Sequence, residues 1–171
     1  MQEVIDMCQK IKDRRLCFIL NPDDVWDKFD NSLKTIVQAD WYEAKFLDDT
    51  GSNLHNDMIN LPNNCGGIYI FILKPEVIPK THIYILYIGR CKYTVYQNLR
   101  KRCCEYIKDT NRPKILAMIN SWGKHLYIRY LPLVDNDVIE SLEDELIETI
   151  FPPCNDKYPK KVTRMAMKAA F

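Results

Sequence analysis

Two apolar runs rich in β-branched and aromatic residues, over 67–73 and 82–88, constrain the fold more than any other feature. The residues between them include Pro75 and Pro79, and proline cannot donate to the hydrogen-bonded ladder of a sheet. We therefore expect two strands that are joined by a long connection as a hairpin. A third strand is expected over 124–133, which predicts a small sheet of three strands.

Helical periodicity predicts the elements around this sheet. Apolar residues recur at helical spacing over 94–109, 113–121 and 137–151. Before the hairpin we expect a short helix within 1–20, a second helix that begins at 21–24 and a polar connection over 48–66, and after the last strand a closing helix over 162–171. The order of elements predicts an α+β fold with a mixed or antiparallel three-stranded sheet flanked by helices. Residues 1–65 would form an N-terminal helical accessory segment, and residues 66–171 the main domain.

The composition is typical of one globular domain. The chain has 171 residues, of which 47% are hydrophobic and 27% are charged, and a chain of this length can bury a core without disulfides or a structural metal. Its seven cysteines include no C-x-x-C pair, so we expect neither a disulfide framework nor a zinc site. We also expect neither a secretory signal nor a membrane span. These expectations together favour a cytoplasmic protein.

Charge is distributed unevenly, although the formal net charge is only +1. Residues 88–130 contain ten lysines and arginines and two acids, whereas residues 133–156 contain eight acids and no base. A basic segment followed by an acidic one is compatible with a protein that binds a polyanion and holds a cation beside it on carboxylates. Solvated helix faces produce the same pattern, so charge alone leaves both interpretations open.

One carboxylate of the helix predicted in the acidic segment departs from the amphipathic pattern. At about 100° per residue, Leu142 and Leu146 lie on an apolar arc, and Glu143 falls inside this arc. Glu140 and Asp144 fall on the solvent side. A carboxylate on a buried face costs free energy unless it is paired or binds a metal. Glu143 is therefore a candidate metal ligand or a member of a structural ion pair.

Two tyrosines and an arginine are further candidates for a polar site. Tyr69 and Tyr87 each lie two residues from a glycine, and glycine in a strand often marks the close approach of a ligand or of backbone. Tyrosines in strands are nevertheless more often packing residues. Arg102 lies at the margin of a helix face, where a guanidinium can bind phosphate through two hydrogen bonds or extend past the apolar side to water. That apolar face is expected to contain Val95, Leu99, Cys103, Tyr106 and Ile107.

Taken together, these residues resemble the motifs of the GIY-YIG nuclease family. Gly67-Ile68-Tyr69 and Tyr87-Ile88-Gly89 match the two tripeptides that give the family its name. The other matching segments are residues 98–102 followed by Tyr106, which resemble the family's arginine helix, residues 142–147, which resemble the segment with its metal-binding glutamate, and Pro153-Cys154-Asn155, which resembles the Pro-x-Asn after it. The resemblance covers residues 66–156.

The details of these motifs are similar to two branches of the family. The long hairpin and an insertion around 92–97 resemble the restriction-enzyme branch. Tyr rather than His at position 106 resembles the nuclease domain of the bacterial excinuclease that acts in nucleotide excision repair. The insertion leaves two candidates for the family's arginine, Arg100 and Arg102, of which Arg102 keeps the four-residue step to Tyr106.

The resemblance implies a role for each matching residue. Glu143 would bind one divalent cation per site, Mg²⁺ or Mn²⁺. Tyr69 would act as a general base or orient the attacking water, and Arg102 would bind the scissile phosphate. The other implied site residues are Tyr87, Tyr106, Arg90 and Asn155. The basic residues expected to contact nucleic acid are Arg100, Lys92, Arg112, Lys114 and Lys124.

The function that the resemblance implies is a metal-dependent DNA endonuclease, of restriction or defence type, that leaves 5′-phosphate and 3′-hydroxyl ends. DNA as the substrate rests on the resemblance, and RNA stays open. One alternative is a nucleic-acid-binding module without hydrolytic activity. Another is a nuclease subunit that is active only in a larger assembly. A homodimer is compatible with cleavage of both strands, and no membrane partner is expected.

Overall fold

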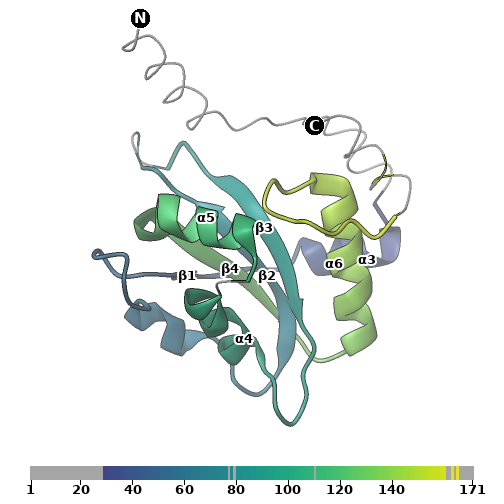
Figure 1. Ribbon diagram of the computed structural model, residues 1–171. Helices are drawn as coiled ribbons and strands as arrows, with labels where there is room; N and C mark the ends of the chain where they lie inside the picture. Colours follow the sequence, from purple (N-terminus) through teal and green to yellow (C-terminus); the bar gives the residue numbers. More distant parts are fainter. Residues whose placement is uncertain are drawn as a thin grey trace, which may run out of the picture.

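The structure is a computed structural model that describes residues 29–76, 78, 80–109, 111–160, 163 and 165. It contains one antiparallel sheet with helices on both faces (Figure 1), and the predicted α+β class is confirmed. The helix expected within 1–20, the helix start at 21–24 and nearly all of the closing helix over 162–171 lie outside the described residues.

The sheet has four strands in the order β1-β4-β2-β3, and each neighbouring pair is antiparallel. The strands are β1 (Tyr42–Lys45), β2 (Gly66–Leu73), β3 (Tyr84–Cys91) and β4 (Leu126–Leu133). The expectation of three strands is therefore corrected, because β1 pairs with β4 and adds an edge strand. Only Ala44 of β1 is fully buried, so this strand has no apolar run that could have predicted it. The segment that was expected to be a helical accessory thus contributes a strand to the sheet.

Within the residues that the structure describes, four α-helices and three short 3₁₀ turns pack around this sheet. They are α3 (Asn31–Val37), η1 (Asn56–Asn60), α4 (Leu99–Glu105), η2 (Tyr106–Lys108), α5 (Pro113–Trp122), η3 (Gly123–His125) and α6 (Asn136–Ile150). Figure 1 shows α4 and α5 over one face of the sheet and α3 and α6 over the other. Each helix in the described part of the chain is too short or too polar to cross a bilayer.

Two local expectations are corrected by capping and burial. The helix expected over 94–109 begins only at Leu99, because the Asn98 side chain accepts a hydrogen bond from the Lys101 N–H and so caps its first turn. Val95, which was expected on the apolar side of that helix, is 93% exposed. The connection over 48–66, which was expected to be polar, contains η1 and places Met58 in the core.

Side chains of the central strand alternate between two separate cores, one on each face. All eight residues of β2 are buried. Tyr69 and Phe71 pack under α4 and α5, whereas Ile68 and Ile70 pack with Ile88 of β3 against α6. Because successive strand residues point to opposite faces, these two packing layers can approach each other only at an edge of the sheet. On the β3 side, that edge lies between α4 and α6 (Figure 1).

Gly67 allows β2 and β4 to approach closely. Its φ is +150°, and an added Cβ would lie 2.2 Å from the carbonyl oxygen of Leu131. We expect Gly67→Ala to lower the free energy of unfolding by about 2–4 kcal/mol, because backbone must move to relieve the clash. Urea unfolding followed by circular dichroism measures this change.

Gly123→Ala is the matched control for this substitution. Its Cβ would meet the end of the Leu47 side chain at 2.9 Å, and a side chain can rotate away where a carbonyl group of the sheet cannot. The loss of stability should be clearly smaller than for Gly67→Ala. Equal losses would contradict the account of Gly67.

Candidate functional site

Three tyrosines meet on the face of the sheet that α4 and α5 cover. Tyr69 of β2 and Tyr106, the first residue of η2, are both buried, and their hydroxyl oxygens are 2.7 Å apart. Tyr87 of β3 is half-buried and packs edge-on against Tyr106, with 5.8 Å between ring centres. Gly89 lies opposite Tyr69 in the sheet register. A Cβ at Gly89 would lie 2.6 Å from the Tyr69 hydroxyl oxygen, so glycine makes room for this phenol.

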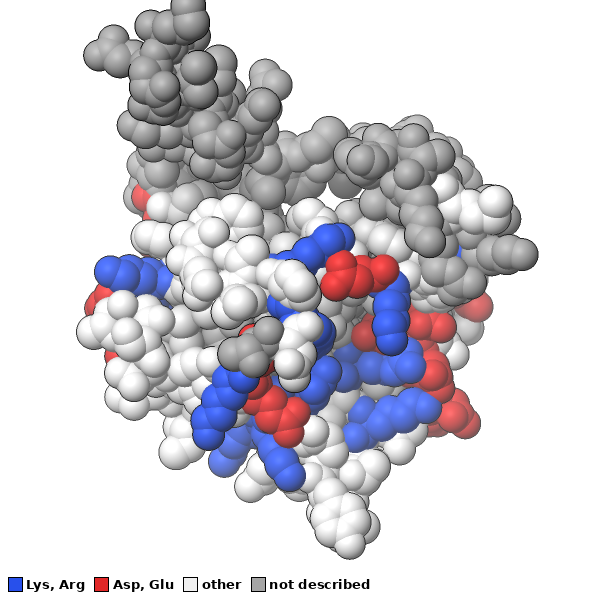
Figure 2. Space-filling view, in the orientation of Figure 1, with Lys and Arg blue, Asp and Glu red and all other residues white. Residues whose placement is uncertain are grey.

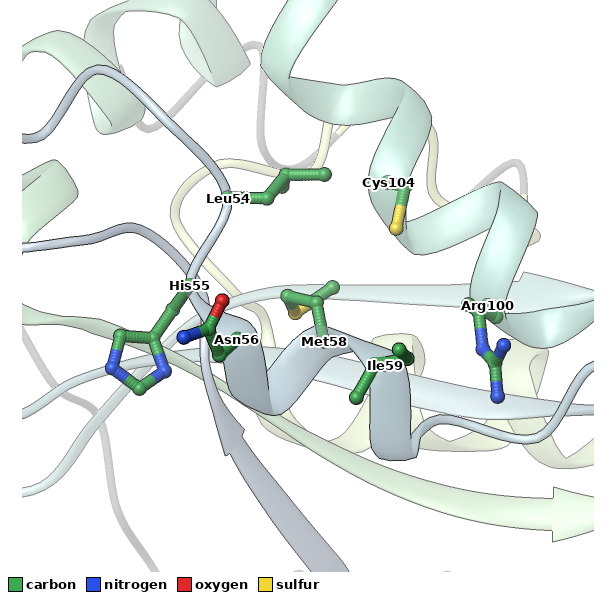
Figure 3. A pocket seen from close by; sticks show the side chains of 7 residues that line it. All are labelled: Leu54, His55, Asn56, Met58, Ile59, Arg100 and Cys104. Carbon is green, nitrogen blue, oxygen red and sulfur yellow. The ribbon is translucent and has the colours of Figure 1, made fainter.

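Of the two candidate arginines, Arg102 is the one that lies at the tyrosine cluster. Its Nε donates to the hydroxyl oxygen of Tyr69 over 3.2 Å, and its guanidinium carbon lies 5.2 Å from the centre of the Tyr106 ring. Arg100 extends to another side of α4, where its Nε donates to the carbonyl oxygen of Leu61 over 2.6 Å. There it lines a pocket of about 350 Å³ between η1 and α4 (Figure 3).

Arg112 provides a second guanidinium at the same cluster. Its Nη1 lies 3.4 Å from the hydroxyl oxygens of both Tyr87 and Tyr106, to which it donates. Its guanidinium carbon is also 4.5 Å from the centre of the Tyr106 ring. Asp109 accepts from Arg112 Nε over 2.5 Å and so orients the guanidinium. The sequence indicated Arg112 only as a nucleic-acid contact, but the structure places it against two of the candidate phenols.

On the other face of the sheet, Arg90 of β3 binds three carboxylates of α6. Its Nη1 donates to Glu143 and its Nη2 to Glu140, each over 2.6 Å, and Asp144 lies 3.4 Å away. Glu143 is the least exposed of the three, with 14% of its side chain accessible against 43% and 46%. Lys92 also donates to Glu140, over 2.5 Å. The helical periodicity predicted this difference in burial, and the structure shows that Glu143 is ion-paired.

Burial and neighbouring charges shift several of these groups. Burial raises the pKa of Glu143, and the nearby Arg90 guanidinium opposes that rise. Burial also raises the pKa values of Tyr69 and Tyr87, so both phenols are protonated at neutral pH. After burial and Tyr106, the Glu143 carboxylate contributes to the raised pKa of Tyr87.

Both clusters include residues of β3, an edge strand of the sheet. Tyr87 belongs to the layer under α4 and α5, whereas Arg90 extends toward α6. Figure 2 shows Lys and Arg side chains in a band across the face where β3 is seen in Figure 1, with Asp and Glu side chains beside it over α6. The arrangement combines groups that bind anions with carboxylates that bind cations.

Asn155 has a structural role at the same edge. Its side-chain oxygen accepts from the Ile88 N–H over 2.9 Å, and its side-chain nitrogen donates to the Ile88 carbonyl over 2.8 Å. The Cys154 N–H also donates to the Leu86 carbonyl over 2.9 Å. Asn155 is only 4% exposed. The chain after α6 therefore satisfies backbone groups of β3 that no neighbouring strand pairs.

The remaining basic candidates are not gathered at the tyrosines. Lys114 of α5 donates to the Asn155 carbonyl over 3.3 Å and pairs with Asp156, so it lies beside the segment after α6. Lys124 lies against the turn at Gly51. Among the candidates from sequence, the structure thus brings together two groups: Tyr69, Tyr87, Tyr106, Arg102 and Arg112 in one, and Arg90, Lys92 and Glu143 in the other.

Four acids that contact these groups were not among the candidates. Glu105 pairs with Arg102, Asp109 orients Arg112, and Glu140 and Asp144 share Arg90 with Glu143. Glu105 and Asp109 each stand three residues from their arginine, but oppositely charged pairs at this spacing are common on protein surfaces. No local pattern could have identified Glu140 and Asp144, because their partner lies about 50 residues earlier in the chain.

We expect Asn155→Ala to lower the free energy of unfolding by about 2 kcal/mol, because it removes two buried hydrogen bonds to the backbone of Ile88. Urea unfolding measures this loss. Asn111→Ala, at an exposed position, is the control and should change stability by less than about 0.5 kcal/mol. An Asn155→Ala protein as stable as the control would contradict the structural role.

Comparisons with known proteins do not assign the chain to a family. No family model matches the chain. No curated protein and no solved structure matches it either. The functional argument therefore rests on the geometry of these residues and on the resemblance of their motifs.

Proposed function

We propose that the chain is a metal-dependent endonuclease that hydrolyses phosphodiester bonds of DNA, and that its sheet and helices are a form of the GIY-YIG nuclease fold. The observation that carries this proposal is that two unlike clusters lie at neighbouring positions of one edge strand, β3. One cluster offers Arg102 and Arg112, and the other offers the half-buried carboxylate of Glu143. Hydrolysis of a phosphodiester needs both cationic groups at the phosphate and a carboxylate that can hold a metal ion.

The position of the candidate site supports a polymeric substrate. It lies along an edge strand under a band of basic side chains (Figure 2). Two hollows of about 350 and 440 Å³ are lined by other residues and contain none of the tyrosines. Small-molecule substrates are usually enclosed in such cavities, whereas an open basic strip suits a long polyanion. A cytoplasmic location fits the five free cysteines in the described part of the chain.

The exposure of the tyrosines suggests different roles for the buried and the accessible ones. Tyr69 and Tyr106 are 0% and 1% exposed, so their linked hydroxyls would position Arg102 and Arg112 rather than touch the substrate. Tyr87 is half-buried, so part of its side chain is accessible. Its protonated phenol would orient the attacking water through a hydrogen bond. Arg102 and Arg112 would bind the phosphate and stabilise its developing charge.

The donor set at Glu143 fits Mg²⁺ or Mn²⁺. Carboxylate oxygens are the hard ligands that these ions prefer, and the Arg90 guanidinium beside Glu143 shows that this position already attracts a cation. Among the described residues, no three His, Cys, Asp or Glu side chains form a metal-binding group. Glu143 would thus be the protein ligand, alongside water and phosphate oxygens. Such a cation would assist departure of the 3′-hydroxyl leaving group, and a 5′-phosphate would remain.

The Arg90–Glu143 ion pair also favours a second candidate, a nucleic-acid-binding module without hydrolytic activity. In that case the pair would satisfy the carboxylate permanently, and no metal would be needed. A nuclease subunit that is active only in a larger assembly is a third candidate function. Cleavage by the purified chain separates the first proposal from both.

We expect purified protein with Mg²⁺ or Mn²⁺ to nick or linearise supercoiled plasmid DNA, and EDTA to abolish the cleavage. Glu143→Gln should lower the rate by about 100-fold or more, because an amide binds the cation poorly. The same variant should still bind DNA in a gel-shift assay. RNA incubated in parallel tests the choice of nucleic acid.

Asp137→Asn is the matched control, since Asp137 is an exposed acid in the first turn of the same helix. Its cleavage rate should equal that of the wild-type protein. DNA binding without any cleavage by the wild-type protein would favour the binding module or the obligate assembly. Equal cleavage by wild type and Glu143→Gln would show that another carboxylate holds the cation.

Arg90 should compete with a metal ion for Glu143. We expect Arg90→Gln to raise the affinity of the DNA-free protein for Mn²⁺ by about 10-fold or more, because it removes a cation 2.6 Å from the carboxylate. Electron paramagnetic resonance of Mn²⁺ measures this affinity. Lys92→Gln, which affects only Glu140 among the three carboxylates, should change it less. An unchanged affinity in Arg90→Gln would rule out the competition.

A further inference from the structure

The connection between β3 and α4, residues 92–98, projects from the molecule beside the candidate site. It follows Cys91, the last residue of β3, and ends at Asn98, the N-cap of α4. Figure 1 shows it at the bottom of the view, below β3 and α4. Because β3 carries Arg90 and α4 carries Arg102, a polymer held between these arginines passes next to this connection.

The tip of this connection exposes apolar and aromatic side chains. Val95 is 93% exposed, Tyr96 84% and Tyr93 45%. Single exposed apolar residues are ordinary on protein surfaces, but here three stand within four consecutive positions. They bury little surface in this fold, so packing within the described chain does not account for them. A local concentration of this kind is typical of an interaction site.

The tip is nevertheless held in a defined shape. Thr94 and Gln97 exchange backbone hydrogen bonds of 2.9 and 3.3 Å across a tight turn. The Asn136 side chain accepts from the Tyr93 N–H over 2.9 Å and donates to the Tyr93 carbonyl over 3.2 Å. The turn is therefore clamped to the start of α6 at its base. A partner that binds Val95 and Tyr96 meets a surface that is already ordered, which reduces the entropy lost on binding.

Two lysines lie beside this tip, and one of them, Lys92, is paired with Glu140. Lys101 of α4 donates from Nζ to the Tyr96 carbonyl over 2.8 Å, and Lys92 stands at the base of the connection. Figure 2 shows the uncharged projection at the bottom of the molecule with Lys and Arg side chains on both sides above it. Aromatic or apolar side chains flanked by basic ones are suited to nucleic acid, where bases stack on the rings while phosphates meet the cations.

We infer that Val95 and Tyr96 contact the bases beside the scissile phosphate and partly unstack them. This inference rests on the proposed nuclease function and adds to it a contact through which the site binds and distorts its substrate. The ring of Tyr96 stacks on a base and Val95 fills the space opened next to it. The arginines of the site then bind a phosphate whose backbone has been displaced from the regular duplex.

The test uses 2-aminopurine, a base whose fluorescence rises when it is unstacked. It is placed in the uncut strand, opposite the cleaved bond, so that the Tyr96 ring does not stack on the probe and quench it. The duplex contains a site mapped by plasmid cleavage, and the Glu143→Gln background keeps it intact. Binding of this protein should raise the fluorescence. Adding Tyr96→Ala should remove most of the rise and weaken binding by about 10-fold. Tyr96→Trp, which keeps an aromatic ring, should restore both.

Tyr42→Ala is the matched control, because Tyr42 is 58% exposed on β1 at the opposite edge of the sheet. It should leave the fluorescence rise and the affinity unchanged. Circular dichroism confirms that each variant is folded, as expected for substitutions at exposed positions.

The outcomes separate this inference from the proposed function. Cleavage by the wild-type protein together with a full fluorescence rise in Tyr96→Ala overturns the inference and leaves the nuclease in place. Loss of a dimer in Tyr96→Ala, seen by sedimentation with fluorescence unchanged, assigns the tip to a second copy of the chain and also overturns it. If the wild-type protein neither cuts nor binds DNA, the proposed function fails, and the inference fails with it.

Discussion

Alternation of side chains across a single thin sheet determines where chemistry can take place in this molecule. Tyr69 and its neighbours belong to the core under α4 and α5, while Ile68 and Ile70 of the same strand seat α6. An acid on α6 therefore cannot approach the tyrosines through the sheet, which is buried along all of β2. The two layers can approach each other only at an edge of the sheet, and the edge next to both clusters is β3. Every candidate role for Glu143 depends on this geometry.

The sequence predicts the strands and helices whose own residues specify them, and misses those that depend on distant partners. The apolar runs of β2 and β3 and the periodicity of α6 indicate these elements directly. By contrast, β1 is held by pairing with β4, a strand more than 80 residues later in the chain. Two of its four residues are exposed, and they carry no periodic signal. Only the folded sheet identifies it.

The candidate site shows the same division between local and long-range information. The four-residue step from Arg102 to Tyr106 is a local property of the sequence, whereas the hydrogen bond from Arg102 to Tyr69 joins residues 33 positions apart and depends on the fold. Accessibility is not local. Tyr69 and Tyr106 are buried while Tyr87 is not, and this depends on how α4, η2 and the segment before α5 pack on the sheet. The motifs identify all three tyrosines but do not indicate which of them is accessible.

The amide of Asn155 has a consequence for the behaviour of the protein in a crowded solution. Edge strands with free N–H and C=O groups are templates for the addition of another chain, and such addition leads to aggregation. Here a side chain and one backbone N–H satisfy Ile88 and Leu86 of β3. Covering the edge with a whole strand would also have enclosed Tyr87 and Arg90. The Asn155 side chain instead protects the edge from self-association and leaves the adjoining surface open to solvent.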